Sequence, residues 1–271
     1  MHPVLFNLGP ITIYTYGVLA AVGFLVGLWY AYRQAPRAGL NPRNVWNLGV
    51  YGILVALISS KLWLVVSDWN YYAANPREIV GIETFQSAGT FYGGILGGIL
   101  FVLLYAYLKK MPFIGILDIG AAPVALGHSI GRVGCFFAGC CYGKPTSLPW
   151  AVTFTSPIAE KIAGMPLNVS LHPTQLYEAG GEFLNFLVLV WLGSRQRFAG
   201  QLVGAYFILY GIERGAIEFL RADPGRTMMF HDAISLMQIV SMGLLFAGAF
   251  LWWRGMRTST PLQSEAARAS R

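Results

Sequence analysis

Long apolar segments alternate with short polar connections along the whole chain. An α-helix of roughly 20 apolar residues is long enough to cross a bilayer core of about 30 Å. By this criterion the pattern predicts an all-α polytopic membrane protein with about seven transmembrane helices. The predicted spans are Ile11–Tyr32, Val45–Val66, Thr90–Leu108, Phe113–Ile130, Pro173–Trp191, Gly200–Leu220 and Ala233–Trp253.

The composition supports a membrane protein. Hydrophobic residues make up 55% of the chain and charged residues only 11%, whereas soluble domains carry about 25% charged residues. The opening MHPVLFNLGP has no basic region, and no small-residue cleavage site follows the first span, so a cleaved signal peptide is not expected.

Basic residues indicate how the predicted spans are oriented. Most of them follow the first, third, fifth and seventh spans: Arg33, Arg37, Arg43, Lys109, Lys110, Arg195, Arg197, Arg254, Arg257, Arg268 and Arg271. Because cytoplasmic loops are enriched in Lys and Arg, the N-terminus is expected outside and the C-terminus in the cytoplasm. Basic membrane flanks also explain the net charge of +7, so no nucleic-acid partner is predicted.

The predicted organisation is a single transmembrane domain over residues 1–255. Two sizeable loops are expected on the outer side, near residues 67–89 and 132–171. Residues 256–271 are polar and rich in small side chains, which is typical of a disordered cytoplasmic tail.

Ionisable residues mark one face of the sixth span. Tyr210, Arg214, Glu218 and Arg221 are spaced four, four and three apart, so they share one stripe of a helix. Charged stripes inside a membrane face protein or a watery cavity rather than lipid. An Arg214–Glu218 ion pair that only orders the helix bundle is the structural alternative.

The fifth span carries a second polar stripe, and Pro173 suits its first helical position. The stripe consists of Gln175, Glu178, Glu182 and Asn185. Together with His128 and Arg132 at the outer end of the fourth span, the two stripes predict an outward-facing polar pocket. Arginine binds phosphate through paired hydrogen bonds, so the pocket suits a phospholipid head group.

Other polar or small residues of the spans are expected to be structural. Asp118 lies in the cytoplasmic half of its span and is interpreted as a structural partner rather than a catalyst. The glycines of FYGGILGGIL and those around Arg132 are small enough for close helix approach.

Four motifs resemble those of the phosphatidylglycerol–prolipoprotein diacylglyceryl transferase family. They are HPTQLYE, GRVGCFFAGCCYGKPT, GTFYGGILGG and LYGIERGAIEFLR, and the first helix, including Tyr16, is also similar. The resemblance implies an enzyme of the bacterial inner membrane, with its active site towards the periplasm. It implies transfer of the diacylglyceryl group of phosphatidylglycerol to the lipobox cysteine of a preprolipoprotein, with a thioether formed and glycerol 1-phosphate released.

The resemblance also implies roles for individual residues. Arg132 and Arg214 would hold the phosphate, and Tyr92 or His128 would act as the base that accepts the proton of the substrate thiol. The implied substrate-binding residues are Tyr16, Gly93, Gly94, Gly131, Gln175, Tyr177, Glu178, Tyr210 and Glu218. The implied partners are phosphatidylglycerol, the signal peptides of preprolipoproteins and the lipid bilayer, and no cofactor is implied.

The chain departs from the family pattern at three positions. Tyr92 stands at the family's histidine, Cys135 at its asparagine and Cys140 at its glutamate. Tyrosine, with a pKa of about 10, is a poorer base near neutrality than histidine at about 6.5. Either His128 supplies the base, or the arginines lower the pKa of the substrate thiol so that no base is needed.

The cysteines leave further alternatives open. Cys135 could form a disulfide with Cys140 or Cys141 in an oxidising compartment. The spacing lacks the two-cysteine knuckle usual for zinc, so no metal site is predicted. A membrane thiol oxidoreductase using the three cysteines, and a non-catalytic phospholipid-binding paralogue, are the rival functions.

Overall fold

The computed structural model describes residues 2–9, 11–81, 90–224, 226–230 and 233–258. The chain is mostly helical and forms two compact units. The first unit comprises Met1–Tyr30 and Leu117–Arg271, and the second comprises Ala31–Ile116.

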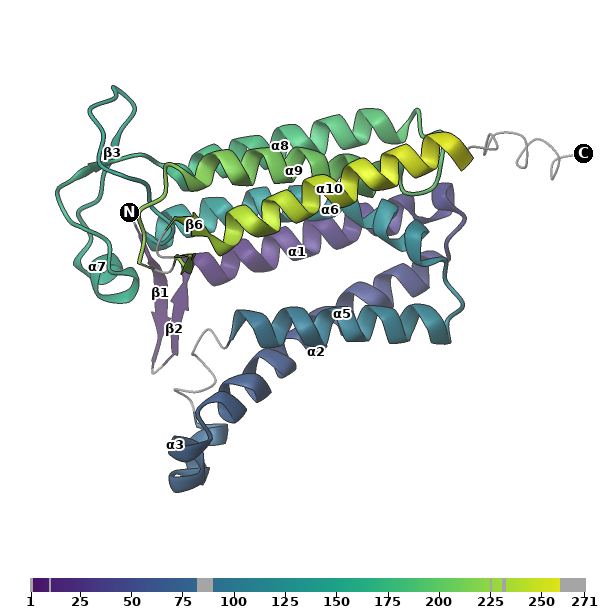
Figure 1. The fold of residues 1–271 in the computed structure, drawn as a ribbon. Helices are drawn as coiled ribbons and strands as arrows, with labels where there is room; N and C mark the ends of the chain where they lie inside the picture. Colours follow the sequence, from purple (N-terminus) through teal and green to yellow (C-terminus); the bar gives the residue numbers. More distant parts are fainter. Residues whose placement is uncertain (1, 10, 82–89, 225, 231–232, 259–271) are drawn as a thin grey trace, which may run out of the picture. The chain divides into compact units, whose positions relative to one another are not determined.

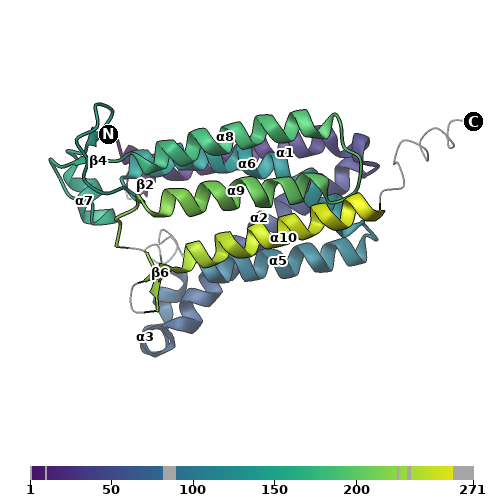
Figure 2. The same ribbon diagram turned by 45° about the horizontal axis from the view of Figure 1, so that its top comes forward.

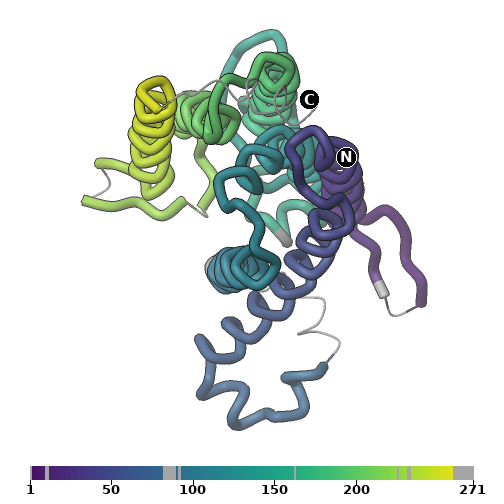
Figure 3. Tube along the Cα trace, turned by 90° about the vertical axis from the view of Figure 1, so that its right-hand side faces the viewer, coloured from purple at the N-terminus to yellow at the C-terminus, as the bar shows by residue number. Residues whose placement is uncertain are grey.

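Five long helices contribute to the first unit. They are α1 (Thr15–Gln34), α6 (Phe113–Ala138), α8 (Thr174–Gly193), α9 (Gln201–Glu218) and α10 (Leu236–Thr258), of which α1 and α6 continue into the second unit. Helix α9 lies between α8 and α10, as Figures 2 and 3 show from two directions. Glycines permit the closest packing: a Cβ on Gly23 of α1 would lie 2.7 Å from the carbonyl oxygen of Gly127 of α6.

The core of the first unit is built mainly from small side chains. Ala121, Ala122 and Ala125 of α6 pack with Leu189 of α8 and with Ala205 and Tyr206 of α9. Alanine at these positions lets the helix backbones come close, and the larger side chains fill the remaining space. The polar cluster of the candidate site is built on these same three helices.

Short antiparallel strand pairs extend from one end of the first unit (Figure 1). The antiparallel pairs are β1 (Val4–Leu8) with β2 (Ile11–Tyr14), β3 (Val152–Thr153) with β4 (Ser170–Leu171), and β5 (Met228–Met229) with β6 (Ile234–Ser235). A short helix, α7 (Pro157–Ala163), lies between β3 and β4 in sequence. The chain is therefore mainly helical, and the all-α prediction missed these strands because each is too short for a clear alternating pattern.

The second unit is a helix pair with short additional turns. Helix α2 (Pro42–Ser67) packs against α5 (Phe91–Leu108), and η1 (Ala35–Ala38), α3 (Trp69–Ala74) and η2 (Pro76–Val80) complete the described elements. A Cβ on Gly93 would lie 2.8 Å from the carbonyl oxygen of Ser59, so this glycine is required for the helix contact. The predicted packing role of these glycines is confirmed at this position.

Four described helices are long and apolar enough to cross a membrane: Thr15–Ala38, Pro42–Ser67, Phe113–Ala138 and Leu236–Thr258. Gly93–Leu108 is a shorter apolar helix. Helices α8 and α9 match the fifth and sixth predicted spans closely in sequence, but their charged stripes lower their apolar character. The chain is thus a helical membrane protein, and the number of seven spans stays a prediction.

Three predicted boundaries need correction. The first and last spans were expected to begin at Ile11 and Ala233, but Ile11 begins β2, Ala233 lies in the turn just before β6, and the helices start at Thr15 and Leu236. Helix α6 continues to Ala138, so Arg132 lies inside a helix and not at the start of a loop. It ends where Gly139 adopts a positive φ of 80°, a conformation that glycine adopts without steric cost.

Candidate active site

Two residues of α6, one helical turn apart, begin the polar cluster. Arg132 Nε donates a hydrogen bond to His128 Nε2 at 3.1 Å, and His128 Nδ1 lies 2.9 Å from Glu182 Oε1 of α8. A guanidinium nitrogen can only donate, so Nε2 is the unprotonated nitrogen of the imidazole. Nδ1 therefore carries the proton and donates it to Glu182, which fixes the tautomer and orients the ring.

Glu178 of α8 lies at the centre of three basic groups. Its Oε1 atom is 2.7 Å from Arg132 Nη2, 3.6 Å from His128 Nε2 and 3.9 Å from Arg214 Nε. The Arg132 contact is an ion pair without hydrogen-bond alignment, because Oε1 accepts no aligned hydrogen bond from the described residues. The sequence prediction that three helices converge on one charged site is therefore confirmed for these residues.

A second carboxylate organises Arg214 from the same helix. Arg214 Nη1 donates to Glu218 Oε2 at 2.7 Å, which is the ion pair that the sequence allowed as a structural alternative. The other oxygen of Glu218 accepts from Arg226 Nε at 2.9 Å. Glu218 thus holds two guanidinium groups, and Arg214 also reaches towards Glu178, so its pairing extends beyond its own helix.

Burial makes this cluster electrostatically strong. The side chains of Arg132 and Arg214 are 13% and 4% exposed, and the carboxylates of Glu178 and Glu218 are almost fully buried. Buried polar atoms normally find partners. Glu178 Oε1, Glu182 Oε2 and Gln175 Oε1 nevertheless accept no hydrogen bond from the described residues. The cluster therefore has unused acceptor capacity, which a ligand or water with N–H or O–H donors could satisfy.

Two tyrosines border the cluster. The ring of Tyr210 lies edge-on to His128 with centroids 5.6 Å apart, and Tyr206 stacks on Tyr210. Tyr206 also donates a hydrogen bond to Glu182 Oε1 at 3.3 Å. Tyr16 packs beside Gly134 of α6, where a Cβ would lie 3.3 Å from its ring. Two of the four tyrosines predicted for the site, Tyr16 and Tyr210, thus lie against the helix that carries Arg132.

Two predicted residues of α8 point to other partners. Gln175 donates to the carbonyl oxygen of Cys140 at 2.7 Å and so anchors the loop after α6. Tyr177 accepts a hydrogen bond from Trp150 Nε1 at 2.7 Å and lies 3.3 Å from His172 Nδ1. The structure therefore does not bring Tyr177 into contact with the guanidinium groups, because consecutive residues of a helix point in different directions.

The glycine motif of α5 belongs to the second unit, whereas the polar cluster belongs to the first. Tyr92, Gly93 and Gly94 lie at the start of α5, and the side chain of Tyr92 is outside the described residues. Their participation in the site stays a prediction. Gly131, next to Arg132, has open space within 4 Å of an added Cβ, so close packing does not require glycine there.

Sequence reasoning missed two charged residues that support the site. Glu213 accepts from Asn185 Nδ2 at 2.7 Å, and its carboxylate packs against Gly181. The sequence signal was present, since an ionisable residue inside a predicted span is seldom incidental. Arg226 was assigned to a loop, and nothing in its spacing from Glu218 indicated that the turn after α9 would bring the two together.

A further ion pair fixes that turn. Arg221 donates two hydrogen bonds to Asp223, both at 2.8 Å. Burial alone would lower the pKa of the Arg221 guanidinium, but the hydrogen bonds to Asp223 and the attraction of nearby negative groups together outweigh it and raise the pKa. Arg221 therefore stays charged, and it belongs to the turn rather than to the stripe of α9 on which the sequence placed it.

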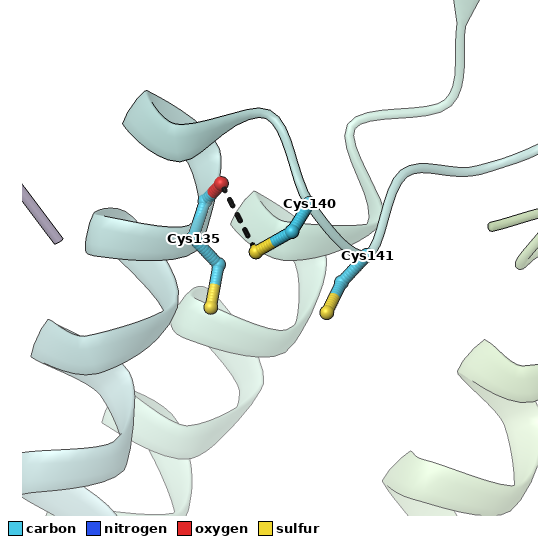
Figure 4. A group of neighbouring side chains, drawn as sticks. All are labelled: Cys135, Cys140 and Cys141. Carbon is cyan, nitrogen blue, oxygen red and sulfur yellow. Dashed lines mark hydrogen bonds between the residues drawn. The ribbon is translucent and has the colours of Figure 1, made fainter. Parts of the chain in front are cut away.

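All three cysteines are free thiols in the structure (Figure 4). Cys135 lies in α6 and is buried, whereas Cys140 and Cys141 follow in the next turn and are partly exposed. Their sulfur atoms all lie within 4.8 Å of one another. The disulfide suggested as an alternative by the sequence is thus not formed here.

Comparison with known proteins identifies the family. The chain matches the family model for "Prolipoprotein diacylglyceryl transferase" over residues 3–254. The chain belongs to this family. Curated proteins named phosphatidylglycerol–prolipoprotein diacylglyceryl transferase are similar over most of their length. The protein of Clostridium tetani is 36% identical, covering 93% of this chain and 97% of the relative. Those of Finegoldia magna (34%; 93% and 94%) and Pseudoalteromonas translucida (32%; 92% and 90%) are similar to the chain in the same way.

Proposed function

We propose that this membrane protein transfers the diacylglyceryl group of phosphatidylglycerol to the lipobox cysteine thiol of preprolipoproteins, the first step of lipoprotein maturation. Its family membership and the names of its relatives support this function. The observation that carries the proposal is the pair of buried guanidinium groups, Arg132 of α6 and Arg214 of α9, which both reach Glu178 of α8.

The two arginines bind the phosphate of the lipid in this proposal. Arg132 makes its contact with Glu178 as an ion pair without hydrogen-bond alignment, so it retains N–H donors for a ligand. Guanidinium groups form charge-assisted, bidentate hydrogen bonds with phosphate oxygens. Glu218 and Glu178 hold the arginines in place and limit the electrostatic cost of burying them without an anion.

The reaction requires one bond to form and one to break. The substrate sulfur attacks the terminal glycerol carbon of the diacylglyceryl group and forms a thioether. The bond between that carbon and the phosphate oxygen breaks, and glycerol 1-phosphate leaves with the electron pair. Arg132 and Arg214 lower the barrier by stabilising the negative charge that develops on the leaving phosphate.

His128 accepts the thiol proton in this proposal, with Tyr92 as the alternative base. The unprotonated Nε2 of His128 faces Arg132, and Glu182 stabilises the imidazolium that forms when Nε2 takes up a proton. Because Arg132 uses this nitrogen as an acceptor, the phosphate of the lipid must first draw the guanidinium away. Lipid binding would therefore free the base, and the order of binding would be lipid first.

The enzyme is proposed to lie in the bacterial inner membrane with seven spans. Basic residues follow alternate spans, which favours a periplasmic N-terminus and a cytoplasmic C-terminus. The site then faces the periplasm, where signal peptides of preprolipoproteins present their cysteine. Phosphatidylglycerol and these signal peptides are the proposed partners within the bilayer.

A reconstituted transfer assay tests the function. Purified protein is mixed in detergent with phosphatidylglycerol and a synthetic lipobox peptide, and mass spectrometry measures the diacylglyceryl adduct. We expect an adduct with the wild-type protein and none with Arg132→Ala or Arg214→Ala. His128→Ala and Tyr92→Phe are compared in the same assay, and the variant that loses activity identifies the base.

The matched control is Arg254→Gln. Arg254 is an exposed arginine of α10 that takes no part in the cluster, so its loss should leave adduct formation unchanged. A folded wild-type protein that binds phosphatidylglycerol but gives no adduct would contradict the proposal. That result would favour a lipid-binding relative without transferase activity.

A further inference from the structure

The three cysteines meet because of the backbone that follows α6. Gly139 closes the helix with a φ of 80° and donates its N–H to the carbonyl oxygen of Cys135 at 2.9 Å. Cys141 then adopts a positive φ of 59°, which is uncommon for a residue other than glycine. These two left-handed residues turn the chain back on itself, so that Cys140 and Cys141 face Cys135 (Figure 4).

The surrounding structure holds this turn in place. Thr174 Oγ1 donates to the carbonyl oxygen of Cys141 at 2.7 Å, and Gln175 Nε2 donates to that of Cys140 at 2.7 Å. A Cβ on Gly139 would lie 2.9 Å from Ala159 Cβ as well as 2.8 Å from Met165 Cε, so the packing also demands glycine. The strained position of Cys141 is therefore maintained by buried contacts, as is common where a backbone serves a site.

The separations of the sulfur atoms suit a metal ion. All three pairs are within 4.8 Å, and none is bonded in a disulfide. Zinc binds thiolates at about 2.3 Å, which places the sulfurs of a tetrahedral site about 3.8 Å apart. Small side-chain rotations would close the present triangle to that spacing.

We propose that Cys135, Cys140 and Cys141 bind one thiophilic metal ion, zinc(II) or copper(I), as a three-thiolate site. Soft thiolate ligands select these two ions, and a trio without a fourth protein ligand matches either a trigonal copper site or a zinc site with one open position. No fourth His, Cys, Asp or Glu joins the trio among the described residues. Binding releases the three thiol protons and changes no oxidation state.

The charges around the trio favour the filled site. Three thiolates with a divalent ion carry one net negative charge, and with a monovalent ion they carry two. Arg221 pairs through an antiparallel backbone bridge with Gly143, two residues after Cys141, so its cation belongs to a segment that adjoins the trio. Arg132 is also three residues before Cys135 on α6, so the site adjoins the cluster that the proposed reaction uses.

Metal analysis of the full-length protein tests the site. The protein is purified under reducing conditions and titrated separately with Zn²⁺ and with Cu⁺, and bound metal per chain is measured by elemental mass spectrometry. Co²⁺ serves as a spectroscopic probe, because thiolate ligands give intense charge-transfer absorption. We expect one metal per chain, and the ion bound more tightly identifies which of the two the site prefers.

Single Cys→Ser variants should each weaken metal binding at least about 100-fold, because each removes a direct ligand. Met165→Leu is the matched control: it removes the thioether that packs on the same turn while keeping the volume, and should bind as the wild type does. Circular dichroism and thermal unfolding of every variant establish that it is folded.

Two outcomes would overturn the metal site. One is a folded wild-type protein with three reduced thiols that binds neither ion. The other is a protein isolated from cells with a disulfide within the trio, seen as a loss of two hydrogens in the intact mass. Neither outcome depends on transferase activity, so the metal site and the proposed function can fail separately.

Discussion

Two buried carboxylates of the first unit, Asp118 and Glu178, differ in how completely they are bonded. Asp118 Oδ2 accepts from the backbone N–H of Gly200 at 2.6 Å and from Gln196 Nε2 at 2.7 Å, and Oδ1 accepts from the N–H of Val203 at 3.0 Å. The two backbone donors lie at the start of α9, so Asp118 caps that helix from α6. The expectation that Asp118 is a structural partner is confirmed.

Glu178 lies beside more basic groups than Asp118 does, but its hydrogen bonds are less complete. Three basic groups, those of Arg132, His128 and Arg214, surround its Oε1 atom, yet no described residue donates an aligned hydrogen bond to it. A fully bonded carboxylate such as Asp118 gains nothing from a ligand. The incompletely bonded cluster around Glu178 can exchange partners, which is what binding and release of a phosphate require.

The largest effect is expected where the incompletely bonded cluster is weakened. Arg214→Lys keeps the positive charge but removes the planar fork that binds phosphate in two places. We expect adduct formation to fall about 10²- to 10³-fold, the usual loss when one donor to a developing anion is removed. The transfer assay measures the rate, and an unchanged unfolding midpoint would separate this effect from a loss of structure. A rate within threefold of wild type would contradict a bidentate role for Arg214.

Removing the fully bonded carboxylate of Asp118 should lower the stability of the protein and leave its transfer rate unchanged. Asp118→Ala leaves the first N–H groups of α9 without their acceptor, which should destabilise the protein by about 2 kcal/mol. Thermal unfolding in detergent measures the loss, and we expect the folded variant to retain its rate per molecule. If Asp118→Ala instead abolished transfer while the unfolding midpoint stayed constant, the distinction between the two carboxylates would be wrong.

A smaller effect is expected at the residue that orients the histidine. Glu182→Gln keeps a hydrogen-bond acceptor for His128 but removes the charge that stabilises the imidazolium. We expect a roughly tenfold slower reaction, as for other partners that fix an imidazole. The slower rate should come with an unchanged dependence on lipid concentration, which initial-rate measurements at several lipid concentrations determine. A change in apparent lipid affinity with a normal maximal rate would assign Glu182 to binding instead.

The smallest effect is expected at an exposed arginine outside both regions. Arg254→Gln should alter stability by no more than about 0.5 kcal/mol and activity by no more than about twofold. Unfolding and transfer assays of this variant set the range against which the other variants are compared. A large effect would mean that total positive charge, rather than the position of the arginines, determines activity.

The helical plan of the molecule could be predicted from sequence because lipid-facing segments leave a strong hydropathy signal. The helices α2, α5, α8 and α9 begin and end within about three residues of the predicted spans, in line with the usual ambiguity of helix ends. The short strand pairs could not be predicted because each strand has too few residues for a clear alternating pattern, and one pair also joins distant segments. β3 and β4 join Val152 with Leu171.

Helical periodicity in the sequence predicted the site residues that share one face of a helix. The four-residue spacing from Arg214 to Glu218 and the four-residue spacing from Glu178 to Glu182 placed these side chains correctly on inward faces. Contacts that depend on turns were beyond this reasoning. Arg226 returns to Glu218 only because the chain reverses after α9.

The cysteines are a second case in which contacts made by a turn could not be predicted from the sequence. Their spacing along the chain argued against a metal site, because it lacks the usual two-cysteine knuckle. A helix end followed by two left-handed residues, Gly139 and Cys141, brings the same sulfur atoms within 4.8 Å. Spacing in sequence is therefore a poor guide to the distances between sulfur atoms where the backbone turns through uncommon conformations, and the absence of a metal site stays an untested prediction.

The central claim is that Arg132 and Arg214 hold the phosphate of the lipid, and lipid binding tests it most directly. Native mass spectrometry of the protein with increasing phosphatidylglycerol measures affinity for the wild type, for Arg132→Gln with Arg214→Gln, and for Arg254→Gln. Charge-assisted hydrogen bonds contribute about 1.5–3 kcal/mol each, so loss of one from each arginine should weaken binding by the double variant at least about 100-fold while Arg254→Gln binds normally. Equal affinity of the wild type and the folded double variant would contradict the account.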